Sequence, residues 1–219
     1  SMSSKAGAFT CALALMVVVG LFGFQFAQRT SVALNSVERN QLYGQLATFH
    51  ANLDTTLYAR LHLVEGLIGF VHAQPNADPA AFRRFARQLG TDTAAIRSLQ
   101  LARGGTVSHV WPQEGNAEAL GHNLLTDPER HKDAMAAIES RKTWLTGPVK
   151  LRQGGTALIA RKPVFLDDME AAGQQRFWGF AVVVLDFVEL LNESSLPTED
   201  DLGRYALREA GNQTRVIYG

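Results

Sequence analysis

The most constraining feature of the chain is an uncharged run of twenty residues near its amino terminus. Residues 8–27 read AFTCALALMVVVGLFGFQFA. A helix of this length spans roughly 30 Å, the thickness of a bilayer core, so we predict a transmembrane anchor within residues 1–28. A cleaved signal peptide is the alternative, but its apolar core is shorter, and cleavage after Ala27 would leave Gln25 where a small residue is normal.

After this run, apolar residues recur in steps of three or four as far as residue 71. They are Leu42, Leu46, Phe49, Leu53, Leu57, Leu61, Val64, Ile68 and Val71. The average step of about 3.6 is the period of an amphipathic helix. We predict one long helix over residues 29–75, ended by Pro75. Its length favours a homodimer formed through this helix, and the alternative is a core helix of a soluble domain.

The chain beyond Pro75 predicts an α+β domain. Asp78 and Pro79 form an N-cap and first-turn pair that opens a short helix. Residues 96–101 and 107–111 have strand-like composition and are joined through a Gly-Gly turn, which indicates a hairpin.

A second helix and three more strands are predicted further along. Asp127 and Pro128 indicate the start of a helix that runs to about residue 141. Strands at 148–152, 156–165 and 176–187 follow, separated by glycine-bearing turns. In the last strand, FWGFAVVVLDF, apolar residues do not alternate with polar ones, so both of its faces are expected to be buried in the centre of the sheet. This order is PAS-like: an antiparallel five-stranded sheet with flanking helices and a small-molecule pocket on one face.

Three segments carry a resemblance to the CHASE family of extracytoplasmic sensory domains of bacterial and plant receptors. They are SLQLARGGTVSHVWPQEGNAEALGHNLL (98–125), TGPVKLRQGGTALIARKPVF (146–165) and WGFAVVVLDFVELL (178–191). The shared pattern is a strand, a proline, a glycine-polar-leucine turn and a helix, then Thr-Gly-Pro before a glycine hairpin and a proline-bearing strand. The segments cover about half of the chain.

The resemblance implies a receptor in the bacterial inner (cytoplasmic) membrane with its sensory lobe, residues 76–192, in the periplasm or outside. It also implies a second transmembrane helix and a cytoplasmic output such as a diguanylate cyclase, a phosphodiesterase or a histidine kinase. Residues 193–219 resemble the opening of a second, membrane-proximal lobe. The chain therefore resembles a fragment of a longer receptor.

Five side chains are candidates for contact with a small ligand. Trp111 stands at a strand end before a proline, where its ring can form an apolar boundary and its N–H can donate. His122 and Asn123 lie in a loop that the PAS-like order places above the sheet. Arg161 is a lone cation on an apolar strand face, and Trp178 belongs to the central strand. For each of them, ordinary packing, capping or solvent contact is the competing interpretation.

Catalysis and nucleic-acid binding receive no support from the residues. Lys plus Arg and Asp plus Glu both total 21, so no basic surplus favours nucleic acid. No nucleophile elbow, HExxH motif or phosphate-binding loop occurs, and we predict neither a metal nor a cofactor. An enzyme would require His109, His122 and Asp127 to meet in space. A structural module that binds a periplasmic protein is the second alternative, favoured if side chains fill the sheet face.

Overall fold

The described part of the predicted long helix is present, and residues 29–39 of that prediction lie outside the described residues. The computed structural model describes residues 40–41, 43–89, 93–151, 154–168 and 173–195, and the backbone of Leu207–Glu209 and Asn212–Tyr218. Residues 43–73 are helical, and the chain turns at Pro75 as predicted. The expected membrane segment at residues 8–27 lies outside the described residues, within which no helix is long and apolar enough to cross a membrane.

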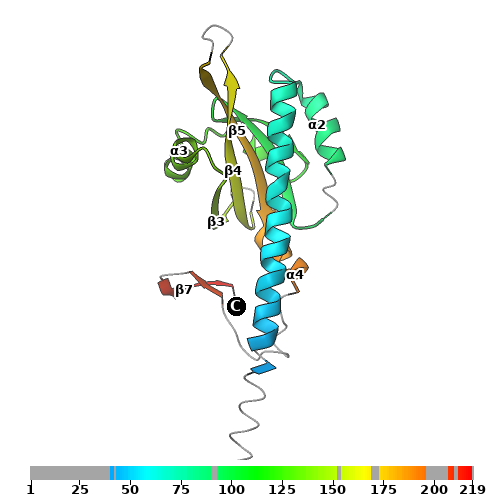
Figure 1. The fold of residues 1–219 in the computed structure, drawn as a ribbon, viewed down its shortest axis with the longest axis vertical. Coiled ribbons are helices and arrows are strands. Elements are labelled where there is room, and N and C mark those ends of the chain that lie inside the picture. The colour runs from blue at the N-terminus through cyan, green and yellow to red at the C-terminus, as the bar shows by residue number, and fades with distance from the viewer. Residues whose placement is uncertain are drawn as a thin grey trace, which may run out of the picture. The chain divides into compact units, whose positions relative to one another are not determined.

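A five-stranded antiparallel sheet follows the helix, as predicted (Figure 1). The strands are β1 (Ile96–Arg103), β2 (Thr106–Trp111), β3 (Trp144–Lys150), β4 (Thr156–Asp167) and β5 (Gln175–Asp186), in the spatial order β2-β1-β5-β4-β3. The last strand along the chain is therefore central, flanked by β1 and β4. Gly104 and Gly105 make the β1–β2 turn with φ of 59° and 87°, which explains the Gly-Gly pair.

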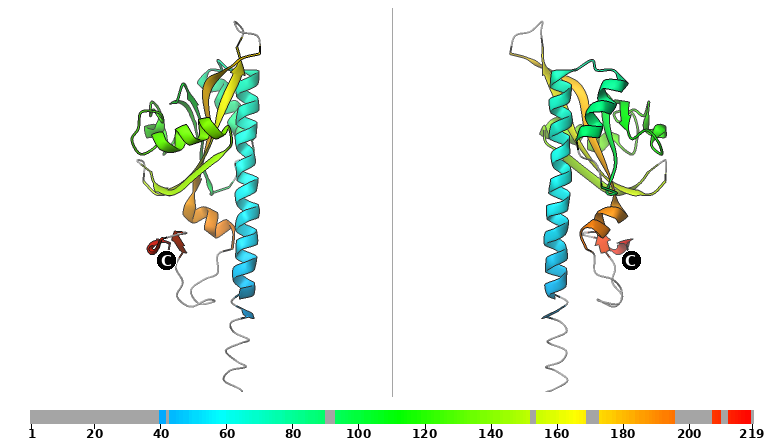
Figure 2. Two further views of the ribbon diagram at one scale, coloured as in Figure 1. Left: turned by 60° about the vertical axis from the view of Figure 1, so that its left-hand side comes forward. Right: turned by 90° about the vertical axis from the view of Figure 1, so that its right-hand side faces the viewer.

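The long helix and the helix α3 (His131–Ser140) lie on opposite faces of the sheet (Figure 2). On the long-helix face, Val64, Leu67 and Val71 pack with Leu99 of β1 and Val183 of β5 in one apolar core. A short helix, α2 (Pro79–Gln88), adds Phe82 to the same core, and Asp78 caps α2 by accepting a bond from Ala81 N at 2.7 Å, as predicted.

The α3 face holds a second, smaller core. Ala134 and Ala137 of α3 pack with Ile159 of β4 and with Val182 and Val184 of β5. The small alanine side chains allow α3 to approach the sheet closely. Successive residues of β5 thus alternate between two apolar cores, and this explains why residues 177–185 include no polar side chain.

Two ion pairs join the long helix to the sheet domain. Arg60 Nη2 lies 2.9 Å from Glu193 Oε2, at the end of the helix α4 (Phe187–Glu193). The other oxygen of Glu193 accepts a bond from the backbone N–H of Ala95, just before β1. Lys162 Nζ of β4 lies 2.6 Å from Glu65 Oε1. These pairs orient the helix, while the buried apolar stripe supplies most of its stability.

The prediction for the start of α3 is wrong. We expected Asp127 to cap the helix and Pro128 to occupy its first position, but α3 begins at His131, with Arg130 as its N-cap and no side-chain cap bond. The Asp127 carboxylate instead accepts from Glu129 N at 2.8 Å and pairs with His122. The strand β3 also begins earlier than the expected residue 148, at Trp144, through a bulge between Thr146 and Val149.

Near the carboxyl end, β6 (Leu207–Glu209) and β7 (Asn212–Tyr218) form a separate two-stranded antiparallel sheet. By its contacts the chain divides into two units, Ser1–Thr48 and Phe49–Gly219.

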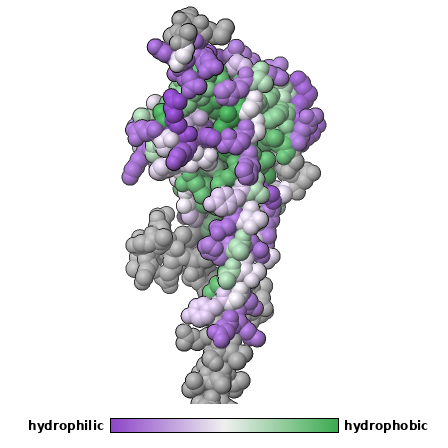
Figure 3. All heavy atoms as spheres, in the orientation of Figure 1, coloured by the Kyte–Doolittle hydropathy of each residue, from purple (hydrophilic) through white to green (hydrophobic). Residues whose placement is uncertain are grey.

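In Figure 3, green hydrophobic residues of the sheet domain gather beside the long helix, whose own visible face alternates between purple, white and pale green. The outer face of this helix is therefore mixed in polarity.

Candidate functional site

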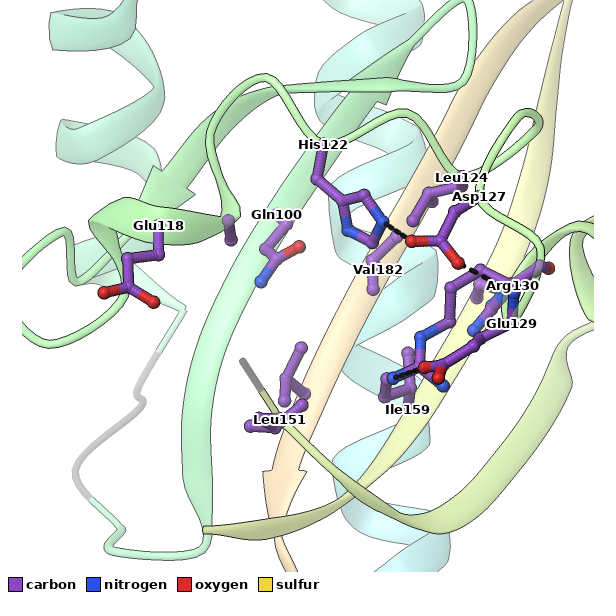
Figure 4. A pocket seen from close by; sticks show the side chains of 13 residues that line it. Gln100, Glu118, His122, Leu124, Asp127, Glu129, Arg130, Leu151, Ile159 and Val182 are labelled. Atoms are coloured by element: carbon purple, nitrogen blue, oxygen red, sulfur yellow. Dashed lines mark hydrogen bonds and ion pairs between the residues drawn. The ribbon is translucent and has the colours of Figure 1, made fainter. Parts of the chain in front are cut away.

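A cavity of about 60 Å³ opens on the α3 face of the sheet. We call it the α3-side cavity. Figure 4 shows its floor, formed by Gln100 of β1, Val182 of β5 and Ile159 of β4, beneath the loop that carries His122 and Asp127. The remaining residues that line it are Glu118, Ala119, Leu124, Glu129, Arg130, Leu151, Arg161 and Val184. An apolar floor with a few polar groups above it is the usual composition of a small-molecule site.

His122 and Asp127 form the polar side of the cavity. His122 Nε2 lies 2.6 Å from Asp127 Oδ2, and the two side chains are 18% and 8% exposed. Figure 4 shows them pointing toward each other from one loop. This loop is held to the hairpin, because Val107 N donates to His122 O at 2.9 Å and Gly121 N donates to Val107 O at 2.8 Å. The pair therefore links two residues of the same loop, five positions apart, above the sheet.

Arg161 of β4 is fully buried at the cavity, with no exposed surface. It shares a strand face with Ala157 and Ile159, as the alternation in the sequence predicted. One of its nitrogens, Nη1, donates to the carbonyl oxygen of Arg130 at 3.3 Å. The other two, Nε and Nη2, are buried without a hydrogen-bond partner anywhere in the described part of the chain. Unmet donors on a buried cation cost free energy, which makes this residue a candidate for ligand contact.

Burial lowers the pKa of Arg161 to about 10, with nearby Asp133 opposing the decrease and Arg130 adding to it. Arg161 is therefore a cation at neutral pH. Asp133 does not neutralise it by contact, because its two oxygens accept bonds from Trp144 Nε1 at 3.3 Å and from Thr146 Oγ1 at 2.8 Å. The guanidinium keeps its charge inside the domain with one hydrogen bond.

The two tryptophans predicted as ligand contacts lie on the other face of the sheet. Trp178 is 5% exposed in the core under the long helix, and its Nε1 donates to the carbonyl oxygen of Pro75 at 3.1 Å. Trp111, which pairs with Leu99, packs against the same core. Neither lines the α3-side cavity. The structure thus brings together Arg161 and His122 and separates both from the tryptophans.

Asn123 has a structural part in the loop over the sheet. Its Oδ1 accepts from Leu125 N at 2.8 Å and from Thr126 N at 3.1 Å, while its Nδ2 donates to Thr106 Oγ1 at 3.0 Å. It fastens the turn that positions His122 without lining the cavity itself. A local contact of this kind was the alternative to ligand contact that the sequence left open for Asn123.

Sequence reasoning missed Gln100 and Arg130 as cavity residues. Gln100 is 6% exposed, and its Nε2 donates to Ser98 Oγ at 2.9 Å. Ser98 and Gln100, at alternate positions of the strand Ile96–Arg103, were the available signal for polar side chains on this face. No sequence pattern marked Arg130.

The catalytic arrangement required by the enzyme alternative is not assembled. His109 packs edge-on against Phe82 of α2, with ring centroids 5.3 Å apart, and its Nε2 donates to the carbonyl oxygen of Ala77 at 3.1 Å. It does not line the cavity that holds His122 and Asp127. Among the described residues, no group of three or more His, Cys, Asp or Glu side chains is placed to hold a metal ion.

Comparison with solved structures found a sensor domain of similar fold and a second, weaker match. The sensor domain of the histidine kinase DctB from V. cholerae aligns with a TM-score of 0.50 and 17% identity, over 76% of this chain and 60% of that one. An extracellular ligand binding receptor from Desulfohalobium retbaense DSM5692 aligns with a TM-score of 0.45 and 14% identity, over 72% of this chain and 26% of that one. The chain thus spans less than two thirds of either protein. A search of curated proteins found no match.

The family model for the CHASE domain matches residues 45–218. This match covers the helical residues from 45 onward, the whole five-stranded sheet with α2, α3 and α4, and the strands β6 and β7. CHASE domains are sensory and not catalytic. The resemblance seen in the three sequence segments is confirmed, and the chain belongs to the CHASE family of extracytoplasmic sensory domains.

Proposed function

We propose that this chain is the input domain of a transmembrane signalling receptor and that a small molecule binds in the α3-side cavity. The observation that carries the proposal is the cavity itself, which combines the apolar side chains of Val182 and Ile159 with the polar groups of Arg161, His122 and Gln100. Of the five residues proposed from the sequence, Arg161 and His122 are those that face this ligand. Trp111, Asn123 and Trp178 support the fold around the site.

The organisation of the receptor belongs to the same proposal. Residues 1–28 anchor the chain in the bacterial inner membrane, residues 29–75 form the helix that pairs two copies, and residues 76–192 sense the ligand outside the cytoplasm. Residues 193–219 begin a membrane-proximal lobe. A diguanylate cyclase, phosphodiesterase or histidine kinase domain beyond this sequence would give the output. The ligand acts by shifting a population of conformations, and a nearly complete switch requires about 5.5 kcal/mol of differential affinity.

A domain that recognises only a protein partner is the second candidate. It would be favoured if side chains filled the sheet face above Arg161. The α3-side cavity argues against complete filling, since it is bounded by groups whose hydrogen-bonding capacity the described residues do not use. Small-molecule sensing is therefore the better supported function.

Thermal unfolding of the chain in detergent micelles tests the proposal. We would screen amino acids, purines, carboxylates and short peptides, and expect at least one class to raise the unfolding temperature in a saturable manner. A ligand at 100 times its dissociation constant stabilises the folded state by about 2.7 kcal/mol.

A cavity-filling variant locates the effect. Ala119→Phe places a ring at a residue that lines the cavity, whereas Ala117→Phe places the same ring at an exposed residue of the same short helix, η1 (Ala117–Ala119). The ligand response should vanish in Ala119→Phe and persist in Ala117→Phe. If no compound stabilises the chain, or if both variants respond as the unmodified chain does, the proposal fails.

A further inference from the structure

We propose that the α3-side cavity recognises a small carboxylate, which binds side-on to the guanidinium of Arg161. This inference rests on the proposed function and deepens it by naming the chemical class of the ligand. It starts from the buried donors of Arg161, from their arrangement on the guanidinium, and from the size of the cavity beside them.

The two unmet donors of Arg161 lie along the same edge of the guanidinium plane. Nε and Nη2 direct parallel N–H bonds to one side, while Nη1, which donates to the carbonyl oxygen of Arg130, lies at the other side. Two parallel donors match the two oxygens of a carboxylate, and bidentate pairs of this kind are the strongest that arginine forms. A single carboxylate would therefore satisfy both unmet donors at once.

The carboxylates that line the cavity do not fill this role. Asp127 lies 2.6 Å from His122, and Glu129 lies 3.9 Å from Arg130 with its side chain 81% exposed. Glu118 is exposed at the rim. None of these acids is bonded to Arg161 in the part of the chain that the structure describes. Within the described residues, the two donors are therefore left for a bound ligand.

The size of the cavity limits the ligand to a small molecule. A volume of about 60 Å³ corresponds to about four to six water positions, since each needs about 10–15 Å³ on this measure. A carboxylate with a short carbon chain fits this space, with its apolar part over Ile159 and Val182. A second polar group on the ligand would meet Gln100 or His122 on the opposite side.

Arg161 has no exposed surface, so its donors are closed off from solvent before the ligand binds. A carboxylate reaches them when the segment that covers the site moves, and that segment contains Arg130, whose carbonyl oxygen accepts the bond from Nη1. Binding is therefore coupled to a displacement of the residues that lead into α3. This coupling is what a sensor requires, because the bound and unbound conformations then differ.

Sodium acetate is the probe for a direct test on the 219-residue chain in detergent micelles. Acetamide serves as the neutral isostere, sodium phosphate as a different anion, and sodium chloride as the control for ionic strength. We expect acetate to raise the unfolding temperature in a saturable manner and acetamide and chloride to leave it unchanged. Equal shifts with acetate and acetamide, or a shift with phosphate alone, would overturn the carboxylate assignment.

Substitutions at Arg161 test the residue. Arg161→Met keeps the unbranched apolar stem and removes the donors, so the acetate shift should disappear while the unfolding temperature without acetate stays equal or rises. Arg161→Lys keeps the charge but lacks the paired donors, and its apparent affinity for acetate should fall by about tenfold or more. The matched control is Arg141→Met, which removes an exposed guanidinium stacked on Phe165 outside the cavity and should keep the full shift.

The outcomes separate this inference from the proposed function. An undiminished acetate shift in Arg161→Met or, should that variant fail to fold, in Arg161→Lys overturns the role of Arg161. A neutral or cationic compound that stabilises the chain, and loses its effect in Ala119→Phe, would leave the sensory cavity in place and refute the carboxylate. If no compound of any charge stabilises the chain, the proposed function and the carboxylate both fail.

Discussion

Gly179 is a residue of the central strand that has no room for a side chain. Its φ is 152°, and a Cβ placed there would overlap the carbonyl oxygen of Ala102 in β1. We expect Gly179→Ala to lower the free energy of unfolding by about 1–3 kcal/mol or more, because neither backbone can move without breaking the β1–β5 ladder.

Gly69→Ala is the matched control for this substitution. Gly69 lies in the long helix, is exposed, and has open space where a Cβ would project. The alanine should stabilise the helix by up to about 1 kcal/mol. Urea unfolding of both variants checks the pair, and a loss of stability in Gly69→Ala similar to that in Gly179→Ala would contradict the steric explanation.

His109 should make the stability of the domain depend on pH. Burial lowers the pKa of His109, the bond to Ala77 and the charge of Asp78 act in the opposite direction, and Arg103 adds to the decrease. Because the folded chain then binds fewer protons than the unfolded one, this contribution is fully present above about pH 6.5 and is lost as the pH falls through the lowered pKa.

Replacement of the ring isolates this contribution. We expect the free energy of unfolding to fall less between pH 7.5 and pH 5.5 in His109→Gln than in the unmodified chain, as measured by urea unfolding at both pH values. The remaining histidines are present in both proteins, so their contributions cancel in the comparison. An equal decrease in the two proteins would show that His109 titrates alike in the folded and unfolded states.

At the scale of elements, the long helix is part of the core of the sheet domain. Leu67 has no exposed surface and packs in the apolar core beneath the helix. We expect Leu67→Ala to lower the free energy of unfolding by about 2–5 kcal/mol. Asn52→Ala, at an exposed helical residue outside the proposed dimer contact, should not lower it. Urea unfolding distinguishes the two, and equal effects would mean that the helix stands apart from the sheet.

The elements with the strongest periodic or turn signals could be predicted from the sequence. The apolar stripe of the long helix, the Asp78 cap of α2 and the Gly104-Gly105 hairpin are local features, and the structure confirms each of them. The unbroken apolar run of β5 correctly indicated a central strand, because only a strand covered on both faces can lack polar positions.

The start of α3 and the identity of the site residues could not be predicted in the same way. The local signal at Asp127 and Pro128 indicated a cap, and Asp127 does accept from Glu129 N, but α3 begins only at His131. The pairing of the same carboxylate with His122 could not be predicted from a local pattern. Similarly, nothing local shows on which face Trp111 lies. That face depends on the β1–β2 register, in which a bulge follows the pairing of Leu101 with His109.

At the scale of the whole molecule, the proposed homodimer has a testable contact on the outer face of the long helix. Tyr58 is a large, exposed side chain on this face. If two copies pair here, Tyr58→Glu should raise the dissociation constant of the dimer by on the order of tenfold or more, because a charge replaces a buried ring at the contact.

Asn52→Glu introduces the same charge at another exposed helical residue, about a third of a turn around the helix from Tyr58. Sedimentation velocity in detergent measures the association of both variants, and circular dichroism checks that each remains folded. The dimer should persist in Asn52→Glu. An unaltered dimer in Tyr58→Glu would exclude this face as the contact.

The alternation of β5 has a consequence for how a receptor of this build could report on its surroundings. Val182 and Val184 face the cavity, and Ala181, Val183 and Leu185 between and beside them face the long helix. If a ligand binds in the cavity as proposed, the strand it contacts is also the strand on which the long helix packs. A ligand that tilted this strand would therefore also move the residues on which the long helix packs, without an intervening chain of side-chain contacts.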